Sequence, residues 1–146
     1  MDTKAAARRL ASKYDTRDPF AIADDLGCIV MYVRLKKLRG FYRYMKRCHI
    51  IFINDSLDEV QRRLVCAHEL GHMLPHRGLN RFFMDSRTFV VTGKYELDAH
   101  HFAVDLIYSD EELLPFLSRP ISDAAQYMGV PTALAEYRMR SVPHPI

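Results

Sequence analysis

Two histidines with a glutamate between them form the pattern whose chemistry is clearest in this sequence. The run His-Glu-Leu-Gly-His at residues 68–72 places the imidazoles of His68 and His72 at positions i and i+4. On an α-helix these positions lie about 40° apart on one face, so both rings can reach one Zn²⁺ at ~2.0–2.1 Å. Glu69 lies about 100° around the helix, where it can meet a water on the metal. The run predicts the helical half of a zinc hydrolase site, with Glu69 as its base.

This motif requires a helix, and the flanking residues predict one. The apolar, β-branched run at residues 50–53 is typical of a strand that delivers the chain to the motif. Asp55 or Ser56 is expected to cap a helix of about 18 residues by accepting its first amide hydrogens. Pro75 and Gly78 are the expected stop signals.

A catalytic zinc site needs a third protein ligand as well as an open position for water. Five downstream residues are candidates for that ligand: His76, Glu96, Asp98, His100 and His101. His76 lies one turn beyond the motif, but Pro75 interrupts the helix before it. Glu96 and His100 are four residues apart on a second predicted helix and share a face. Glu96 can therefore bind the metal while His100 orients a ligand from behind.

The two motifs together resemble those of the ImmA/IrrE family of small metallopeptidases. The resemblance lies in the run at residues 68–72 followed by His76, and in the downstream pattern Glu96-x-x-Ala99-x-x-Phe102-Ala103. It covers the chain from about Phe20 to Ile107. The resemblance implies a helix-and-sheet domain similar to the minimal core of the thermolysin-like, or gluzincin, zinc peptidases.

The resemblance also implies roles for individual residues. It assigns His68, His72 and Glu96 as the zinc ligands and Glu69 as the general base. Members of the family commonly carry Asn at the position of His100. The expected substrate is a protein, namely a helix-turn-helix repressor of a phage, a mobile element or a stress regulon, whose cleavage relieves transcriptional silencing.

The predicted function is that of a zinc-dependent endopeptidase with one Zn²⁺ per chain, and Mn²⁺ also suits a His/His/Glu site. A donor for the oxyanion is required too. Four residues are candidates for that donor: Tyr95, His49, His76 and His101. The alternative is a zinc-stabilised module that does not cleave and controls a repressor by binding. Glu69 distinguishes the two, because a structural zinc site needs no carboxylate beside the metal water.

The chain of 146 residues is expected to form a single metallopeptidase-like domain of the α+β class. We expect N-terminal helices in residues 1–27, a small sheet in 28–54, zinc-site helices in 55–110, and C-terminal helices with a tail in 111–146. The sheet is predicted to have three strands, to be mainly antiparallel and to pack against the active-site helix.

Besides the motif helix, the pattern predicts helices at 3–14, 18–27, 95–108, 122–128 and 132–139, and strands at 28–33, 40–44 and 48–53. An extended piece is expected at 88–92, and the aromatic pair Phe82 and Phe83 is expected either to line a substrate cleft or to pack as core.

The charge pattern gives a weaker signal. The net charge is only +3, but residues 34–47 hold seven basic side chains and no acidic one. We interpret this segment as a solvated hairpin; the alternative is a site for an acidic partner or a nucleic acid. Residues 121–139 look like a helix-turn-helix, yet they offer few cations, and a helix pair packed under the active-site helix is the better interpretation. No direct binding of nucleic acid is therefore expected.

The remaining composition indicates the compartment. The three cysteines Cys28, Cys48 and Cys66 form no Cys-x-x-Cys pair, so we expect buried free thiols in a reducing cytoplasm. No secretory apolar segment is visible, and no apolar run is long enough to span a bilayer. The sequence does not predict the oligomeric state.

Overall fold

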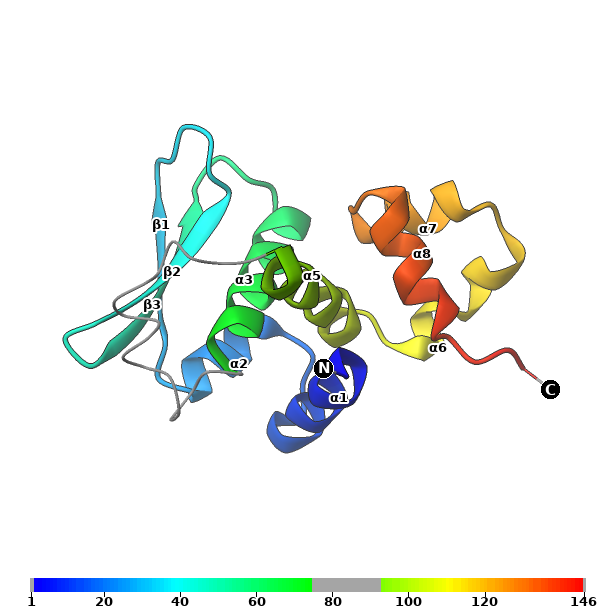
Figure 1. The fold of residues 1–146 in the computed structure, drawn as a ribbon, viewed down its shortest axis with the longest axis horizontal. Coiled ribbons are helices and arrows are strands. Elements are labelled where there is room, and N and C mark those ends of the chain that lie inside the picture. The colour runs from blue at the N-terminus through cyan, green and yellow to red at the C-terminus, as the bar shows by residue number, and fades with distance from the viewer. Residues whose placement is uncertain (1, 75–92, 146) are drawn as a thin grey trace.

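A computed structural model describes residues 2–74 and 93–145 (Figure 1). The elements follow in the order α1 (Thr3–Tyr14), α2 (Pro19–Asp25), β1 (Ile29–Val33), β2 (Gly40–Met45), β3 (Cys48–Asn54), α3 (Glu59–Met73), α5 (Gly93–Ile107), α6 (Asp110–Leu113), the 3₁₀ helix η2 (Leu114–Ser118), α7 (Ile121–Met128) and α8 (Thr132–Arg140). The sheet lies at one end, α3 and α5 lie in the middle, and α6 to α8 form the other end (Figure 1). The predicted α+β class is confirmed.

The sheet is mixed, so the prediction of a mainly antiparallel sheet is wrong. Its strand order is β1-β3-β2, with β1 parallel and β2 antiparallel to β3. The physical reason lies in β3, whose Ile51 and Ile53 are fully buried. The strand with the most buried side chains takes the centre, where both of its edges are paired, and β1 then lies beside it in the same direction because β2 reverses the chain between them.

The inner face of the sheet packs against α3. Ile51 and Ile53 belong to the same core cluster as Val65 of that helix. A Cβ atom on Gly40 would lie 2.5 Å from the Phe52 carbonyl oxygen and 2.5 Å from Cγ1 of Val65. Only glycine therefore allows the first residue of β2 to approach the helix this closely.

The motif helix begins later than predicted. Its N-cap is Asp58, whose side chain accepts a hydrogen bond of 2.8 Å from the Gln61 amide. Asp55 and Ser56 do not cap it, because the Asn54 side chain accepts from both the amide and the hydroxyl of Ser56 and holds these residues in a turn. The helix has 15 residues, and the motif still lies well inside it.

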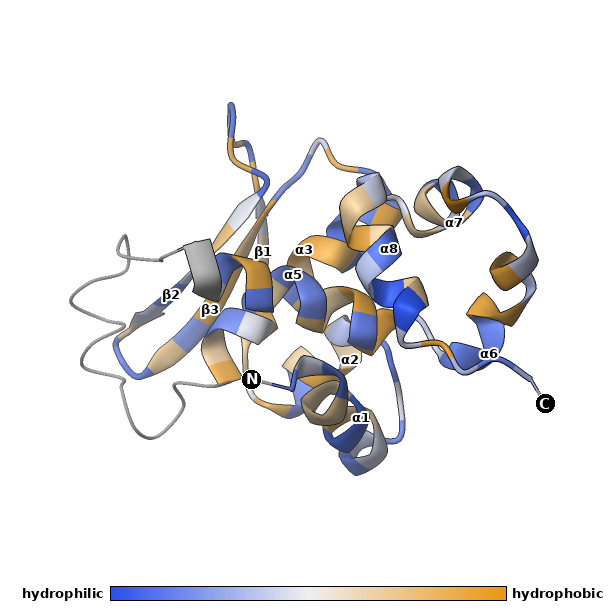
Figure 2. Cartoon of the chain, turned by 45° about the vertical axis from the view of Figure 1, so that its right-hand side comes forward, coloured by the Kyte–Doolittle hydropathy of each residue, from blue (hydrophilic) through white to orange (hydrophobic). Residues whose placement is uncertain are grey.

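The two long helices α3 and α5 each carry both hydrophobic and hydrophilic residues (Figure 2), and hydrophobic residues of both, such as Leu70 and Phe102, belong to one buried core cluster. The second helix, α5, begins at Gly93, two residues before its predicted start. Phe102 and Leu106 are buried in the core, whereas Leu97, in the first two turns of α5, is 53% exposed.

The predicted C-terminal helix pair is present as α7 and α8, joined at Gly129, which has a φ of 71°. The pair packs on α5 and on the first turns of α3. The Tyr108 hydroxyl donates to the Met128 carbonyl oxygen at 2.8 Å, and the Gln61 amide group donates to the Gly129 carbonyl oxygen at 2.9 Å. The short helix α6 was not predicted, although Ser109 and Glu112 form a capping box that the sequence contains.

Of the three free cysteines, Cys28 and Cys66 are buried, as expected, but Cys48 is exposed. Cys48 follows directly on the turn of the β2–β3 hairpin, as the first residue of β3. None of the described helices combines the length and the apolar character needed to cross a bilayer.

Some predictions concern residues that lie outside the described part of the chain. These residues are Pro75, His76, Gly78, Phe82, Phe83 and the extended piece at 88–92.

Candidate metal centre

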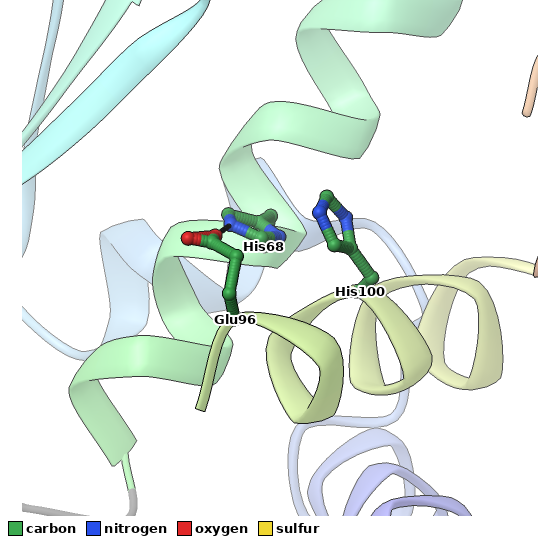
Figure 3. Close-up of side chains that lie close together, drawn as sticks. All are labelled: His68, Glu96 and His100. Carbon is green, nitrogen blue, oxygen red and sulfur yellow. Dashed lines mark hydrogen bonds and ion pairs between the residues drawn. The ribbon is translucent and has the colours of Figure 1, made fainter. Parts of the chain in front are cut away.

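Helices α3 and α5 bring three ligand atoms together. His68 and His72 project from α3, and Glu96 projects from the first turn of α5. The Nε2 atom of His72 lies 3.1 Å from Nε2 of His68 and 3.1 Å from Oε1 of Glu96. Nε2 of His68 also contacts Oε1 of Glu96 (Figure 3). Two residues one turn apart and a third from 24 positions downstream thus converge on one point.

The geometry and the chemistry of this set fit a zinc ion. Tetrahedral coordination at ~2.0–2.1 Å holds ligand atoms ~3.3 Å from one another, close to the separations around His72. Two imidazole nitrogens and a carboxylate oxygen direct their lone pairs at the same small volume. A cation is the kind of ligand that can bind to all three atoms there. Two histidines with a glutamate are also a known protein donor set of catalytic zinc sites.

The charges in this cluster favour an ionised Glu96. Hydrogen bonds from His68 and then His72 hold the pKa of the Glu96 carboxyl well below its usual range. Burial disfavours the charged form of His72, but the hydrogen bond to Glu96 and the nearby Glu69 outweigh it and raise the pKa of His72. Glu96 is therefore an anion, which is the form that binds a metal.

Glu69 lies beside the three ligands, and the contacts that join His68, His72 and Glu96 do not involve it. Its carboxylate belongs with His68 and His72 to a group whose ligand atoms lie within 4.8 Å of one another. The side chain is buried, and burial raises the pKa of the Glu69 carboxyl, although the two histidines oppose that shift. A carboxylate with a raised pKa, held beside the ligands, is suited to take up and return a proton near neutral pH.

His100 lies next to the ligands, on the face of α5 that also carries Glu96. Its ring centroid is 4.2 Å from that of His68, with the ring planes tilted by 43° (Figure 3). Burial, followed by the charge of His68, lowers the pKa of His100 to about 4, so its ring is neutral at neutral pH. Nδ1 of His68 is buried and has no hydrogen-bond partner within residues 2–74 and 93–145. His68, Glu96 and His100 also form a group with ligand atoms within 4.8 Å, so His100 is the nearest of the other ligand candidates.

The remaining candidates lie elsewhere or outside the described residues. The His101 ring stacks on Tyr137, with the ring centroids 3.5 Å apart. Burial lowers the pKa of His101, and the nearby charge of Asp98 acts in the opposite direction. His49 shares a hydrogen bond of 2.6 Å with the Tyr42 hydroxyl in the β2–β3 hairpin. His76 and the Tyr95 side chain lie outside the described residues, so the structure assigns no oxyanion donor among those it describes.

Sequence reasoning missed the part played by Gly71. A Cβ atom on Gly71 would lie 3.1 Å from Cδ2 of Phe102 and 3.2 Å from Cα of Ala99. This glycine therefore allows α3 and α5 to approach each other closely, one residue before His72 and three residues after Glu96 on the facing helix. A glycine inside a helix is unfavourable by ~1 kcal/mol relative to alanine, and that penalty was the signal in the sequence.

Gly71→Val is expected to weaken zinc binding by about 10–100-fold, the range seen when groups that orient ligands are lost. The added side chain separates α3 from α5, so Glu96 moves away from His68 and His72. Competition against a fluorescent zinc chelator measures the affinity. Gln126→Val on the exposed side of α7 is the control, since it adds a β-branched residue to a helix without crowding another. Unchanged zinc affinity in Gly71→Val would contradict this account.

Comparison with known proteins gives one family and two relatives. Residues 23–140 match the Peptidase M78 family model, whose description is IrrE N-terminal-like domain. The chain is 38% identical over 138 residues to the "uncharacterized immunity region protein 2" of Bacillus phage phi105, covering 92% of this chain and 87% of the relative. It is 28% identical over 145 residues to the "metallopeptidase ImmA" of Bacillus subtilis (strain 168), covering 95% of this chain and 85% of the relative.

Proposed function

The chain belongs to the ImmA/IrrE family, and on this premise we propose that it is a zinc-dependent endopeptidase with one specific protein substrate. The observation that carries the proposal is the convergence of His68, His72 and Glu96 beside the buried carboxyl of Glu69. A site that only stabilises the fold has no use for a second, buried carboxyl group next to its three ligands.

In the proposed reaction each side chain has one task. His68, His72 and Glu96 hold one Zn²⁺, which when bound polarises the scissile carbonyl and lowers the pKa of water. Glu69 takes the proton of the attacking water on its carboxylate and then passes it to the leaving nitrogen. Its burial keeps competing bulk water away from the proton.

His100 is proposed to support His68 rather than to bind the metal. The neutral ring lies against the ring of His68 and limits its rotation, so that Nε2 stays directed at Glu96. Metal-binding histidines are commonly oriented by such neighbours. A fourth protein ligand would close the position that water needs in a catalytic site.

The proposed substrate is a DNA-binding repressor of a phage or mobile element, met in the cytoplasm. The name of the phage relative, an immunity region protein, and the name of the B. subtilis relative, a metallopeptidase, support this choice. Residues 1–146 are proposed to act as one domain, because Thr3 of α1 donates to Asp105 of α5, and Lys4 contacts both Asp110 and Ser141 near the C-terminus.

The test is to incubate the zinc-loaded protein with the repressor encoded beside it and to identify the products by mass spectrometry. We expect two fragments from a single cut, and no cut after the metal is removed with a chelator. His72→Ala is expected to bind no zinc and to leave the repressor intact. A repressor that stays whole with the zinc-loaded wild type but loses its DNA binding would instead support the non-cleaving regulatory module.

A further inference from the structure

The sheet has a second face, turned away from α3, that carries apolar side chains. Residues paired across adjacent strands share a face, and the register pairs Ile29 with Ile50, and Met31 with Phe52. Phe52 is also paired with Phe41 of β2, and their rings stack with centroids 4.6 Å apart. We call this set the outer sheet face: Ile29, Met31, Phe41, Met45, Ile50 and Phe52. Arg43, which is paired with Ile50, lies on the same face, and its guanidinium lies over the Phe41 ring, 5.5 Å from the ring centroid.

Three of the six residues of the outer sheet face are exposed to solvent, and Phe41, Ile50 and Phe52 are partly buried. Ile29 and Met31 are each 44% exposed and Met45 is 45% exposed, whereas Ile51 and Ile53 on the inner face are completely buried. The described helices that contact the sheet, α2 and α3, lie on the inner side (Figure 1). Exposed apolar side chains grouped on one face of a folded protein favour an interaction site there.

Cations lie at both ends of this face. Arg34, Lys36 and Lys37 follow the end of β1, while Lys46 and Arg47 form the turn at the opposite end of the strands. β3 has seven residues, so at ~3.3 Å per residue the two groups lie ~20 Å apart. None of Lys36, Lys46 and Arg47 forms an ion pair with an acidic side chain in the part of the chain that the structure describes.

The turn with two of these cations is strained. Lys46 and Arg47 have φ values of 50° and 65°, the left-handed conformation of a two-residue hairpin turn. Asn-Gly suits such a turn far better, because in this conformation a Cβ atom lies too close to the following carbonyl oxygen. Glycine has no Cβ atom, and the short polar side chain of Asn can form local hydrogen bonds that offset the cost. A strained position held by two long cationic residues points to a use for their charge.

We propose that the outer sheet face binds a protein segment that has an apolar centre and acidic residues at both ends. The apolar centre covers residues such as Met31 and Phe52, and the acidic ends meet the two groups of cations. A second copy of this chain would bring like charges together, and a nucleic acid would leave the apolar side chains without a partner. The ligands lie on α3 and α5, on the other side of the sheet from this face, so the proposal is independent of the proposed catalysis (Figure 1).

Labelled peptides test the surface directly. The probe is a fluorescein-labelled peptide with paired glutamates at each end of a short Val/Leu centre, long enough to span ~20 Å. One reference peptide has lysines in place of the glutamates, and another has serines in place of the centre. Fluorescence anisotropy is expected to show the probe binding about tenfold tighter than either reference. Equal binding of all three peptides overturns the proposal.

Variants locate the site. Lys46→Glu with Arg47→Glu is expected to weaken probe binding about tenfold, whereas Lys13→Glu with Arg119→Glu, which changes the net charge equally at exposed sites elsewhere, leaves it unchanged. Met31→Ser is expected to weaken binding, and Leu114→Ser, at another exposed apolar position, is not. Glu69→Gln is expected to leave probe binding intact, which separates this proposal from the proposed catalysis.

Replacing the two turn residues with Asn-Gly separates the effect of their charge on probe binding from any effect on the stability of the fold. Lys46→Asn with Arg47→Gly is expected to raise the melting temperature by relieving strain and at the same time to weaken probe binding. Probe binding that survives this change overturns the proposal. If a DNA duplex competes with the probe, and if the Lys46→Glu and Arg47→Glu variant no longer binds that duplex, the surface would be assigned to nucleic acid. Peptide-independent dimers in analytical ultracentrifugation that dissociate in Met31→Ser would assign it to a second copy.

Discussion

Glu69→Gln is expected to lower the rate of peptide hydrolysis by about 10²–10⁴-fold while the protein keeps its metal, the range that a positioned general base contributes. The side chains are nearly equal in size, so the buried site keeps its packing. The amide cannot accept a proton from water, however, and cannot return one to the leaving nitrogen. The loss should therefore appear in kcat, with zinc content unchanged by elemental analysis.

Glu59→Gln is the matched control for this variant. Glu59 lies in the first turn of the same helix, at its exposed end and two to three turns from His68. It should retain the wild-type rate. If Glu69→Gln keeps the full rate, Glu69 is not the base. If it loses cleavage but still controls the repressor, regulation proceeds by binding, as the alternative function requires.

Arg138→Ala is expected to destabilise the protein by about 3–5 kcal/mol, the usual effect of removing one partner of a buried ion pair. Arg138 is only 1% exposed. Its guanidinium donates to the Tyr108 carbonyl oxygen and to Asp110, each at 2.8 Å, and lies 3.7 Å from the buried Asp105. The change leaves the Asp105 carboxylate in the interior without its cation, and it removes a link between α5, α6 and α8. Urea unfolding measures the difference.

The exposed Arg140 on the same helix gives the control, since Arg140→Ala should change stability by no more than about 0.5 kcal/mol.

The pH dependence of stability gives a second check. Burial already raises the pKa of Asp105, against hydrogen bonds from Tyr137 and Thr3 and the charge of Arg138. Without Arg138 that pKa rises further, so the folded state binds a proton more readily than the unfolded chain. The deficit of Arg138→Ala should then shrink as the pH falls from neutral toward the ordinary range of Asp. A deficit that stays constant with pH would show that Asp105 is not its source.

Local patterns account for what could be predicted about the helices. Asp18 and Pro19 specify the start of α2 in adjacent residues, and the structure places them as N-cap and first residue. The motif helix was predicted from its period, although its cap is Asp58 because Asn54 already binds Ser56. Such errors arise where several polar side chains compete for the same backbone amides.

Contacts between distant segments could not be predicted in the same way. The mixed sheet has β3 at its centre because β3 is more deeply buried than β1 and β2, and this is a comparison between strands rather than a property of one. The outer sheet face likewise depends on the register, which pairs Met31 with Phe52 and leaves both on the side without a described helix. Seven cations in residues 34–47 were visible in the sequence, but the apolar surface between them was not.

The sequence alone determined the family motifs and placed His68 and His72 on one helix face, because a spacing of four residues fixes two side chains within one turn. It left the third ligand open on physical grounds, and the resemblance alone pointed to Glu96. Only the tertiary structure decided which candidate meets the histidines: the close approach of α3 and α5 at Gly71 brings Glu96 to His72 and turns His101 toward Tyr137. The distance between two helices is set by the side chains packed between them, so it cannot be predicted from the spacing of residues along either helix.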